Sequence, residues 1–359
     1  MYLGSIWDEC KYKVQKYSIQ DIKKLLLSRV REILVDNNRQ RETPIGKEEL
    51  RCVKRSDLVE ILAENLPPET IRFGCQIVAV KLDPLSSDPV LQLYDGTFIK
   101  AKVVIGSDGA NSVVAEFLGL KATKLFSYCA IRGFTNHPTG HGLNNEFIRT
   151  NREGILQGRI PVDDKLVCWF IGRQWTPEDS RISKDPKLVK ESAVQSIKAF
   201  PSEMVELVKN SDIDSVSLVR LRYRTPWDVL LGSFRKGRVT VAGDAMHVMG
   251  PFLGQGGSAG LEDAIVLARC LVKEISSVVG VEGCQQRRKL MPETSVLEAA
   301  LDRYIRERKM RIVRLSTQTY LTGLLLRTSV PLIRFSLLIL LFVLFGNSLG
   351  HTRYDCGRL

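Results

Sequence analysis

The segment at residues 243–264, GDAMHVMGPFLGQGGSAGLEDA, constrains the fold of this chain more than any other. It follows a short apolar strand pattern at residues 238–242, RVTVA, and leads into a helical pattern over residues 258–274. The segment contains six glycines and one proline. Because glycine lets a backbone turn tightly and approach another molecule closely, the segment predicts a strand, a long loop and a helix start that contact a ligand.

One match to the dinucleotide-binding pattern GxGxxG/A lies in this segment, at residues 254–259. That pattern requires a strand that leads directly into its glycines, whereas eleven residues separate Ala242 from Gly254. We therefore interpret the segment as a different glycine loop. Asp244, just past the strand, can accept hydrogen bonds from sugar or ribityl hydroxyls, and the helix start favours an anion or an electron-rich ring edge. An ordinary turn with a capping aspartate is the alternative.

The remaining pattern predicts an α/β (α+β) fold, in which a discontinuous α/β domain is interleaved with an antiparallel-sheet domain and a helical C-terminus follows. An amphipathic helix is predicted over residues 18–35, within a separate N-terminal segment at residues 1–49. Residues 50–125 and 236–290 are expected to form the discontinuous α/β domain. Short strand patterns predict the antiparallel-sheet domain at residues 126–235. Residues 291–359 form the expected helical end.

Composition narrows the classes of function. The chain has 359 residues, a formal charge of +12, 44% hydrophobic and 26% charged residues, which is typical of a globular protein. The densest basic run, at residues 306–314, lacks interleaved aromatic residues, so we expect a solvated helix face and no nucleic acid partner. Eight cysteines without metal-ligand spacing predict reduced thiols. Pro138 and Gly140 break any helix that would align His137 with His141, so no metal site is predicted.

The two ends bear on location. The first residues contain no apolar signal-peptide core, so we expect a cytoplasmic protein, with a chloroplast or membrane-associated location as alternatives. Residues 329–350 are very apolar, but Arg334 interrupts them and leaves eleven nearly continuous apolar residues at 335–345, where a span needs about 20. A helix packed on the protein is the first interpretation. A peripheral membrane contact and a snorkelling span are the alternatives.

Three segments carry a resemblance to a known family. Residues 243–264 resemble the Gly-Asp motif of the FAD-dependent aromatic-hydroxylase-type monooxygenases, and residues 103–119, VVIGSDGANSVVAEFLG, resemble their Asp-Gly motif. Residues 53–62, VKRSDLVEIL, resemble the segment whose arginine contacts the flavin. The order of the motifs also agrees. The chain is most similar to the plant monooxygenases related to zeaxanthin epoxidase and salicylate hydroxylase.

The resemblance implies that the discontinuous domain is an incomplete FAD/NAD(P)-binding Rossmann-like domain and that the antiparallel sheet forms a substrate domain. It also implies a set of cofactor contacts. It places Arg55 at the flavin nucleotide, and Asp108 and Gly109 near the pyrophosphate and the path of NAD(P)H. It assigns the ribityl chain to Asp244. The residues that it places at the flavin ring are Pro251 beside it and Gly254, Gln255 and Gly256 at its pyrimidine edge.

The resemblance also implies the reaction. NAD(P)H reduces FAD, O2 adds to form a hydroperoxyflavin, and a small hydrophobic or aromatic substrate is hydroxylated or epoxidised. The flavin carries the chemistry, so no catalytic side chain is assigned. Phe252, Leu253, Phe147 and Trp169 are expected to line the substrate site. A flavin reductase or a halogenase on the same scaffold is a further interpretation.

Two departures from the family pattern matter. Ala115 replaces an arginine that often closes the Asp-Gly motif, which bears on the use of the nicotinamide cofactor. The resemblance covers residues 50–359. The only glycines in residues 1–49 are Gly4 and Gly46, so this segment contains no GxGxxG unit for the FAD pyrophosphate. We therefore expect weakened FAD binding. The alternative to an active monooxygenase is a truncated, FAD-deficient remnant that binds a partner or a small ligand.

Overall fold

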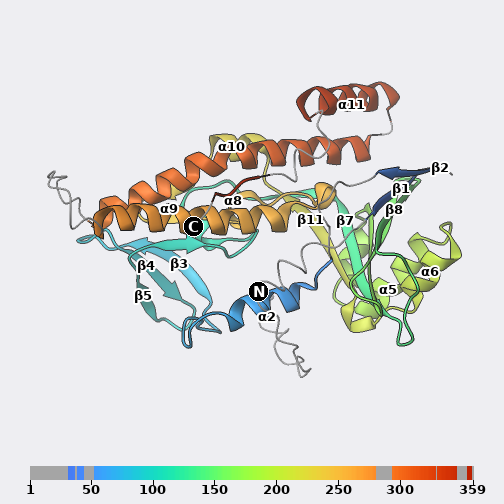
Figure 1. Cartoon of the computed structure of the whole chain (residues 1–359), viewed down its shortest axis with the longest axis horizontal. Coiled ribbons are helices and arrows are strands. Elements are labelled where there is room, and N and C mark those ends of the chain that lie inside the picture. The colour runs from blue at the N-terminus through green and yellow to red at the C-terminus, as the bar shows by residue number, and fades with distance from the viewer. Residues whose placement is uncertain are drawn as a thin grey trace. The chain divides into compact units, whose positions relative to one another are not determined.

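The computed structural model describes residues 31–36, 39–43, 52–279, 293–328, 330–345 and 354–357. The chain divides into two compact units (Figure 1). Residues 1–74 and 127–221 form the first unit, and residues 75–126 and 222–359 form the second unit. The four domain boundaries expected from the sequence stay a prediction.

The first unit is built on a seven-stranded sheet with the order β11-β7-β10-β9-β8-β1-β2. Its strands are β1 (Arg31–Asp36), β2 (Arg39–Thr43), β7 (Lys124–Asn136), β8 (Glu146–Arg152), β9 (Ile155–Pro161), β10 (Leu166–Gln174) and β11 (Ser217–Tyr223). Strand β10 runs antiparallel to both β7 and β9, as the short strand patterns predicted.

Strand β1 corrects one prediction. A helix was predicted over residues 18–35, but the last residues of that range lie in strand β1, which pairs antiparallel with β2 and parallel with β8. The run of Ile33, Leu34 and Val35 is as suitable for a strand as for a helix face, because β-branched residues fit a pleated surface. The earlier part of that predicted helix lies outside the described residues.

Helices cover one face of this sheet. They are α4 (Pro177–Ile182), α5 (Pro186–Ser196) and α6 (Ser202–Lys209), while α2 (Arg55–Glu64) also belongs to the first unit. The alternating residues Val167, Trp169 and Ile171 of β10 are fully buried in the core that also contains Val189 and Val208. Figure 1 shows α5 and α6 beside the sheet.

The second unit contains two small sheets. Strands β3 (Ile77–Leu82), β4 (Pro89–Leu93) and β5 (Phe98–Lys100) form an antiparallel meander. The other sheet has the order β12-β13-β6, with β12 (Arg235–Lys236), β13 (Val239–Val241) and β6 (Val104–Gly106). Strands β13 and β6 run parallel although most of the first unit lies between them in the sequence. This pairing makes the second unit discontinuous.

Long helices pack beside these sheets. The second unit contains α3 (Val113–Phe117), α7 (Pro226–Leu231), α8 (Asp244–His247), the 3-10 turn η2 (Pro251–Leu253), α9 (Gly256–Val279), α10 (Glu293–Arg327) and α11 (Pro331–Phe345). Helices α9 and α10 lie side by side, and α11 packs on α10 (Figure 1). No helix within the described residues combines the length and the hydropathy that crossing a bilayer requires. The predicted class, a Rossmann-like domain with antiparallel sheets and a helical C-terminus, is confirmed.

Candidate functional site

The turn after β13 presents an aspartate to solvent. Gly243 has a φ of 59° and a ψ of −142°, a conformation that residues with a Cβ avoid. The chain then enters α8 with Asp244, whose side chain is exposed. Its carboxylate has no hydrogen-bond or ion-pair partner among the described residues. Asp244 therefore lies just past the carboxyl end of β13 with its side chain exposed to solvent.

The start of α9 forms an open backbone surface. Gly254 ends η2 in the left-handed region with a φ of 65°, and the carbonyl oxygen of Gln255 accepts the first helical hydrogen bond, from the nitrogen of Ala259, at 2.9 Å. A Cβ atom added at Gly254, Gly256 or Gly257 would meet no heavy atom within 4 Å. No side chain in the described part of the chain therefore covers these three positions, and the first N–H groups of a long helix are available there to a polar ligand.

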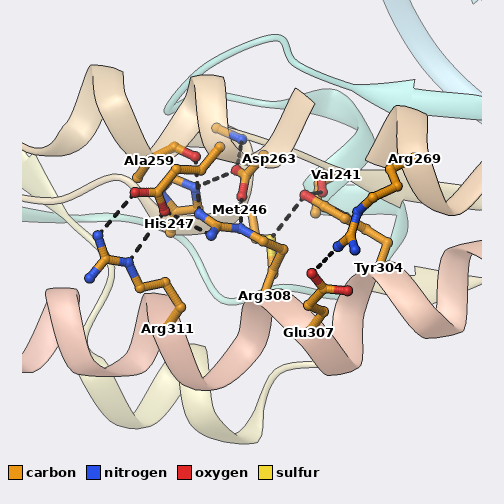
Figure 2. Close-up of polar contacts among 12 residues, drawn as sticks. Val241, Met246, His247, Ala259, Asp263, Arg269, Tyr304, Glu307, Arg308 and Arg311 are labelled. Carbon is orange, nitrogen blue, oxygen red and sulfur yellow. Dashed lines mark hydrogen bonds and ion pairs between the residues drawn. The ribbon is translucent and has the colours of Figure 1, made fainter. Parts of the chain in front are cut away.

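A buried cluster of charged residues fixes this surface (Figure 2). The Oδ2 atom of Asp263, on α9, lies 2.6 Å from Nε2 of His247 on α8, and accepts a hydrogen bond from the nitrogen of Gly243 at 2.8 Å. The Oδ1 atom accepts a hydrogen bond from Nε of Arg308 on α10 at 2.7 Å. All three side chains are fully buried. One carboxylate thus joins the turn before Asp244, α8, α9 and α10.

Ionisation in this cluster follows from its pairing. Burial alone would raise the pKa of Asp263, but the hydrogen bond with His247 and the charges of His247 and Arg308 hold that pKa below its usual value. Burial also opposes the charge on Arg308, yet Asp263 raises the pKa of Arg308 above its usual value. Asp263 and Arg308 are therefore a buried ion pair, which is stable because each charge has a specific partner.

Arg308 corrects a prediction about the basic run at residues 306–314. The run was expected to form a solvated face, but Arg308 is fully buried, forms an ion pair with Glu262 at 2.7 Å and lies 4.6 Å from the ring centre of Tyr354. Met310, two residues later, is exposed. Successive residues of this run lie on the buried and on the exposed face of the helix. The density of charge in the sequence therefore could not indicate which arginine faces inward.

The cluster of Asp263, His247 and Arg308 was not predicted from the sequence. His247 and Asp263 both lie in the segment at residues 243–264 that resembles the Gly-Asp motif, which is a local signal for these two residues. Arg308 had no such signal. Tyr304, also buried on α10, donates a hydrogen bond to the carbonyl oxygen of Val241 at 3.2 Å, which adds a second connection between α10 and the end of β13.

The Asp-Gly motif forms a loop between β6 and α3. Asp108 accepts a hydrogen bond from the nitrogen of Val113 at 2.9 Å, and Gly109 has a φ of 80°. Ser112 caps α3 by accepting a hydrogen bond from the nitrogen of Ala115 at 2.8 Å. Ala115 is buried in the core. The carboxylate of Asp108 thus holds its own loop, and the position of the family's arginine faces the interior in this chain.

Arg55 lies in the first unit, at the start of α2, where it is exposed. The other predicted cofactor contacts, at residues 108, 109, 244, 251 and 254–256, lie in the second unit. Within that unit, β13 and β6 are paired, so the Gly-Asp turn and the Asp-Gly loop follow the carboxyl ends of neighbouring parallel strands. The role of each of these residues toward a cofactor stays a prediction.

The prediction that Trp169 lines a substrate site is wrong. This side chain is fully buried in the core between the sheet and its helices, because it alternates with Val167 and Ile171 toward that face. Phe147 stacks on Phe170, with ring centres 5.9 Å apart, on partly exposed positions. Phe252, in the second unit, packs edge-on against Phe126 at 5.4 Å.

Relatives of known sequence support the motif reading. The sequence profile of the FAD binding domain family matches residues 29–284. Monooxygenase 1 of Arabidopsis thaliana is 44% identical over 338 residues, which cover 93% of this chain and 83% of that protein. Monooxygenase 2 of the same plant is 37% identical over 283 residues, which cover 77% of this chain and 66% of that protein.

Solved structures show the same fold. A substrate complex of salicylate hydroxylase has a TM-score of 0.67 at 19% identity, over 91% of this chain and 80% of that chain. HpxO of Klebsiella pneumoniae, in complex with FAD and uric acid, has a TM-score of 0.67 at 16% identity, over 89% of this chain and 78% of that chain. The resemblance found in the motifs is confirmed: this chain belongs to the FAD binding domain family, the FAD-dependent monooxygenases of the aromatic-hydroxylase type.

Proposed function

We propose that this chain is an FAD-dependent monooxygenase that uses NAD(P)H and O2 to hydroxylate or epoxidise a small hydrophobic or aromatic molecule. The observation that carries the proposal is the open, glycine-lined start of α9 beside the unpartnered carboxylate of Asp244. The names of relatives give the substrate class only, since HpxO is in complex with uric acid and salicylate hydroxylase with its substrate.

The described residues fit the ring and ribityl end of FAD. The positions without a neighbouring heavy atom, at Gly254, Gly256 and Gly257, provide space for a flat ligand against the helix start. When bound there, FAD would supply the redox chemistry, with hydride from NAD(P)H and oxygen from O2. Gly254, Gln255 and Gly256 would hold the pyrimidine edge of the ring. Asp244 would accept hydrogen bonds from the ribityl hydroxyls.

The chain's own residues would then position the flavin ring and stabilise negative charge on it. The N-terminal end of α9 carries partial positive charge, which favours negative charge on a ring edge placed against it. The buried carboxylate of Asp263 fixes the turn at Gly243 to the same helix, so Asp244 and the helix start keep a constant separation. Pro251 and Phe252 would limit the access of water to the ring from their side of the loop.

The nucleotide end has weaker support. Strand β6 is an edge of its sheet among the described strands, and α9 exposes an apolar stripe at Leu261, Ile265, Val272 and Ile275. These spacings are those of one helix face, which ordinarily packs on another element. An additional strand beside β6 and a helix beside α9 would cover both features, and would supply a pyrophosphate site of the GxGxxG type.

The same open edge favours the second candidate function, a remnant deficient in FAD that binds a partner or another small ligand. The two candidates differ in a simple measurement on the purified protein. A yellow protein with flavin absorbance, or a colourless one that takes up FAD, supports the monooxygenase. Oxygen uptake coupled to NAD(P)H oxidation, with an oxygenated aromatic product, separates it from a reductase or a halogenase. A folded protein that FAD cannot reconstitute contradicts the proposal.

A further inference from the structure

Helix α11 (Pro331–Phe345) has an unusual surface for a protein in water. Nine large apolar side chains are exposed along its fifteen residues: Leu332, Ile333, Phe335, Leu338, Ile339, Leu340, Phe342, Val343 and Leu344. The exposed fractions of Leu332 and Phe342 reach 75%. Scattered apolar residues are normal on a surface, but a contiguous patch of this kind indicates a contact with something else.

The exposed side chains occupy most of the helix circumference. Successive residues of an α-helix lie about 100° apart, so these nine positions cover an arc of roughly 240°. The remaining arc faces α10: Leu337, Leu341 and Phe345 are the more buried positions, and Arg314 of α10 lies over the ring of Phe345 at 5.8 Å. Figure 1 shows α11 on the outer side of α10.

The width of this apolar arc favours contact with the acyl chains of a lipid bilayer over docking in a protein groove. A helix that docks in a groove or on a second copy presents an apolar stripe of about 100° and keeps polar side chains on its other face. Helix α11 has no such polar face. Its one serine, Ser336, donates a hydrogen bond to the carbonyl oxygen of Leu332 at 2.9 Å, so that hydroxyl is satisfied within the helix, as hydrocarbon surroundings require.

The charges nearby favour an anionic surface. Between Glu307 and Asp355 the sequence contains seven Lys and Arg residues and no Asp or Glu. Arg314, Arg327 and Arg334 of this group are exposed on α10 and α11. Basic side chains next to an apolar helix increase its affinity for bilayers that contain anionic lipids. At 1.5 Å per residue, α11 is about 22 Å long, shorter than the roughly 30 Å hydrocarbon core, so the helix lies in the interface.

We propose that α11 is a membrane-contact helix that binds this protein peripherally to the surface of an anionic bilayer, with its apolar arc among the acyl chains and Arg327 and Arg334 at the headgroups. The cytoplasmic location expected from the sequence then becomes the cytoplasmic face of a membrane.

The test is flotation of the full chain with lipid vesicles, either of phosphatidylcholine alone or with about 30% phosphatidylglycerol. Wild-type protein is expected to float with the anionic vesicles. Phe342→Glu combined with Val343→Glu should reduce the partition coefficient about tenfold or more. The matched control is Leu85→Glu combined with Leu231→Glu, because these exposed leucines, 99% and 79% accessible, lie outside α11. Arg327→Ala with Arg334→Ala should remove the preference for anionic vesicles.

A second variant keeps the proposal falsifiable if glutamate at α11 impairs folding. Phe342→Trp should add a blue-shifted emission, relative to wild type, that brominated acyl chains quench. Wild-type protein that does not float, an equal loss in the Leu85 and Leu231 control, or an unquenched tryptophan would overturn the proposal. One further result would overturn the proposal: wild-type protein that does not bind vesicles but forms a defined dimer in lipid-free buffer, which the α11 variant dissociates. The apolar surface of α11 would then contact a second copy of the chain.

Discussion

The Nε2 atom of His247 lies 2.6 Å from the Oδ2 atom of Asp263, and both side chains are fully buried (Figure 2). The same oxygen accepts the N–H of Gly243, so this contact holds the turn that presents Asp244 against the helix that begins at Gly256. The two parts of the candidate flavin site are fixed to each other by a carboxylate that is itself fully buried. Asp263 is therefore a positioning residue.

Asp263→Asn should lower the free energy of unfolding by about 3 kcal/mol at pH 7, because it removes the fully buried one of the two carboxylates that pair with Arg308 and leaves only Glu262. The pKa of Asp263 is held below its usual value of about 3.9. Its contribution is therefore present above about pH 4 and is lost as the pH falls through the lower folded pKa. Denaturant unfolding across an acidic pH series measures both effects. Asp164→Asn, an exposed aspartate, is the control, and equal pH dependence in both variants would contradict this role.

Asp244→Ala should abolish residual flavin binding while the thermal midpoint stays within about 2 °C of wild type, since surface substitutions without partners change stability little. The carboxylate is exposed and has no partner among the described residues. Flavin absorbance after desalting and thermal unfolding measure the two quantities. Glu191→Ala, at an exposed position of α5, should change neither. Unchanged flavin retention in Asp244→Ala would count against the site.

Gly257→Leu should reduce flavin affinity about tenfold or more without destabilising the fold. A side chain at this position enters open space in the protein alone, and glycine inside a helix is itself about 1 kcal/mol less favourable than alanine. Gly260→Ala is the matched control on the same helix, because its Cβ would lie 3.8 Å from the Cα of Gly243, an ordinary contact. Equal flavin titrations for the two variants would mean that the open surface is not the binding surface.

Adding an N-terminal strand–helix segment of the GxGxxG type should raise FAD content severalfold, because β6 has a free edge among the described strands and α9 has an exposed apolar stripe. The added segment should increase the affinity for FMN, which lacks the adenosine half, much less than the affinity for FAD. Comparing the two cofactors by fluorescence titration isolates the nucleotide end. A folded, extended protein with unchanged FAD content would show that the open edge serves another purpose.

Local patterns predicted many elements of this fold. The Asp95-Gly96 pair is typical of a two-residue hairpin turn, and β4 and β5 form this hairpin with Gly96 at a φ of 83°. The glycines at 254–257 predicted the open helix start. Residues 187–209 have a helical pattern in the sequence, but the structure forms two helices there, α5 and α6, which Pro201 separates because proline lacks the N–H that a continuous helix needs. These outcomes depend on backbone chemistry within a few residues.

The missed features depend on tertiary packing. Arg308 pairs with Asp263 from forty-five positions away, and nothing in the local sequence indicates which arginine of a dense basic run turns inward. Trp169 was expected at a substrate surface, but the face that a strand residue takes is decided by the helices that cover the sheet. Partners that are distant in sequence could be identified only once the fold was known.

The most direct test of the central claim is a titration of the intact chain with riboflavin, which carries only the ring and the ribityl chain, followed by fluorescence quenching. The proposed site assigns these two parts to the glycine-lined start of α9 and the carboxylate of Asp244, so saturable binding is expected in wild type and its loss in Asp244→Ala. Absence of saturable binding to folded wild-type protein, or equal binding by both proteins, would contradict the account.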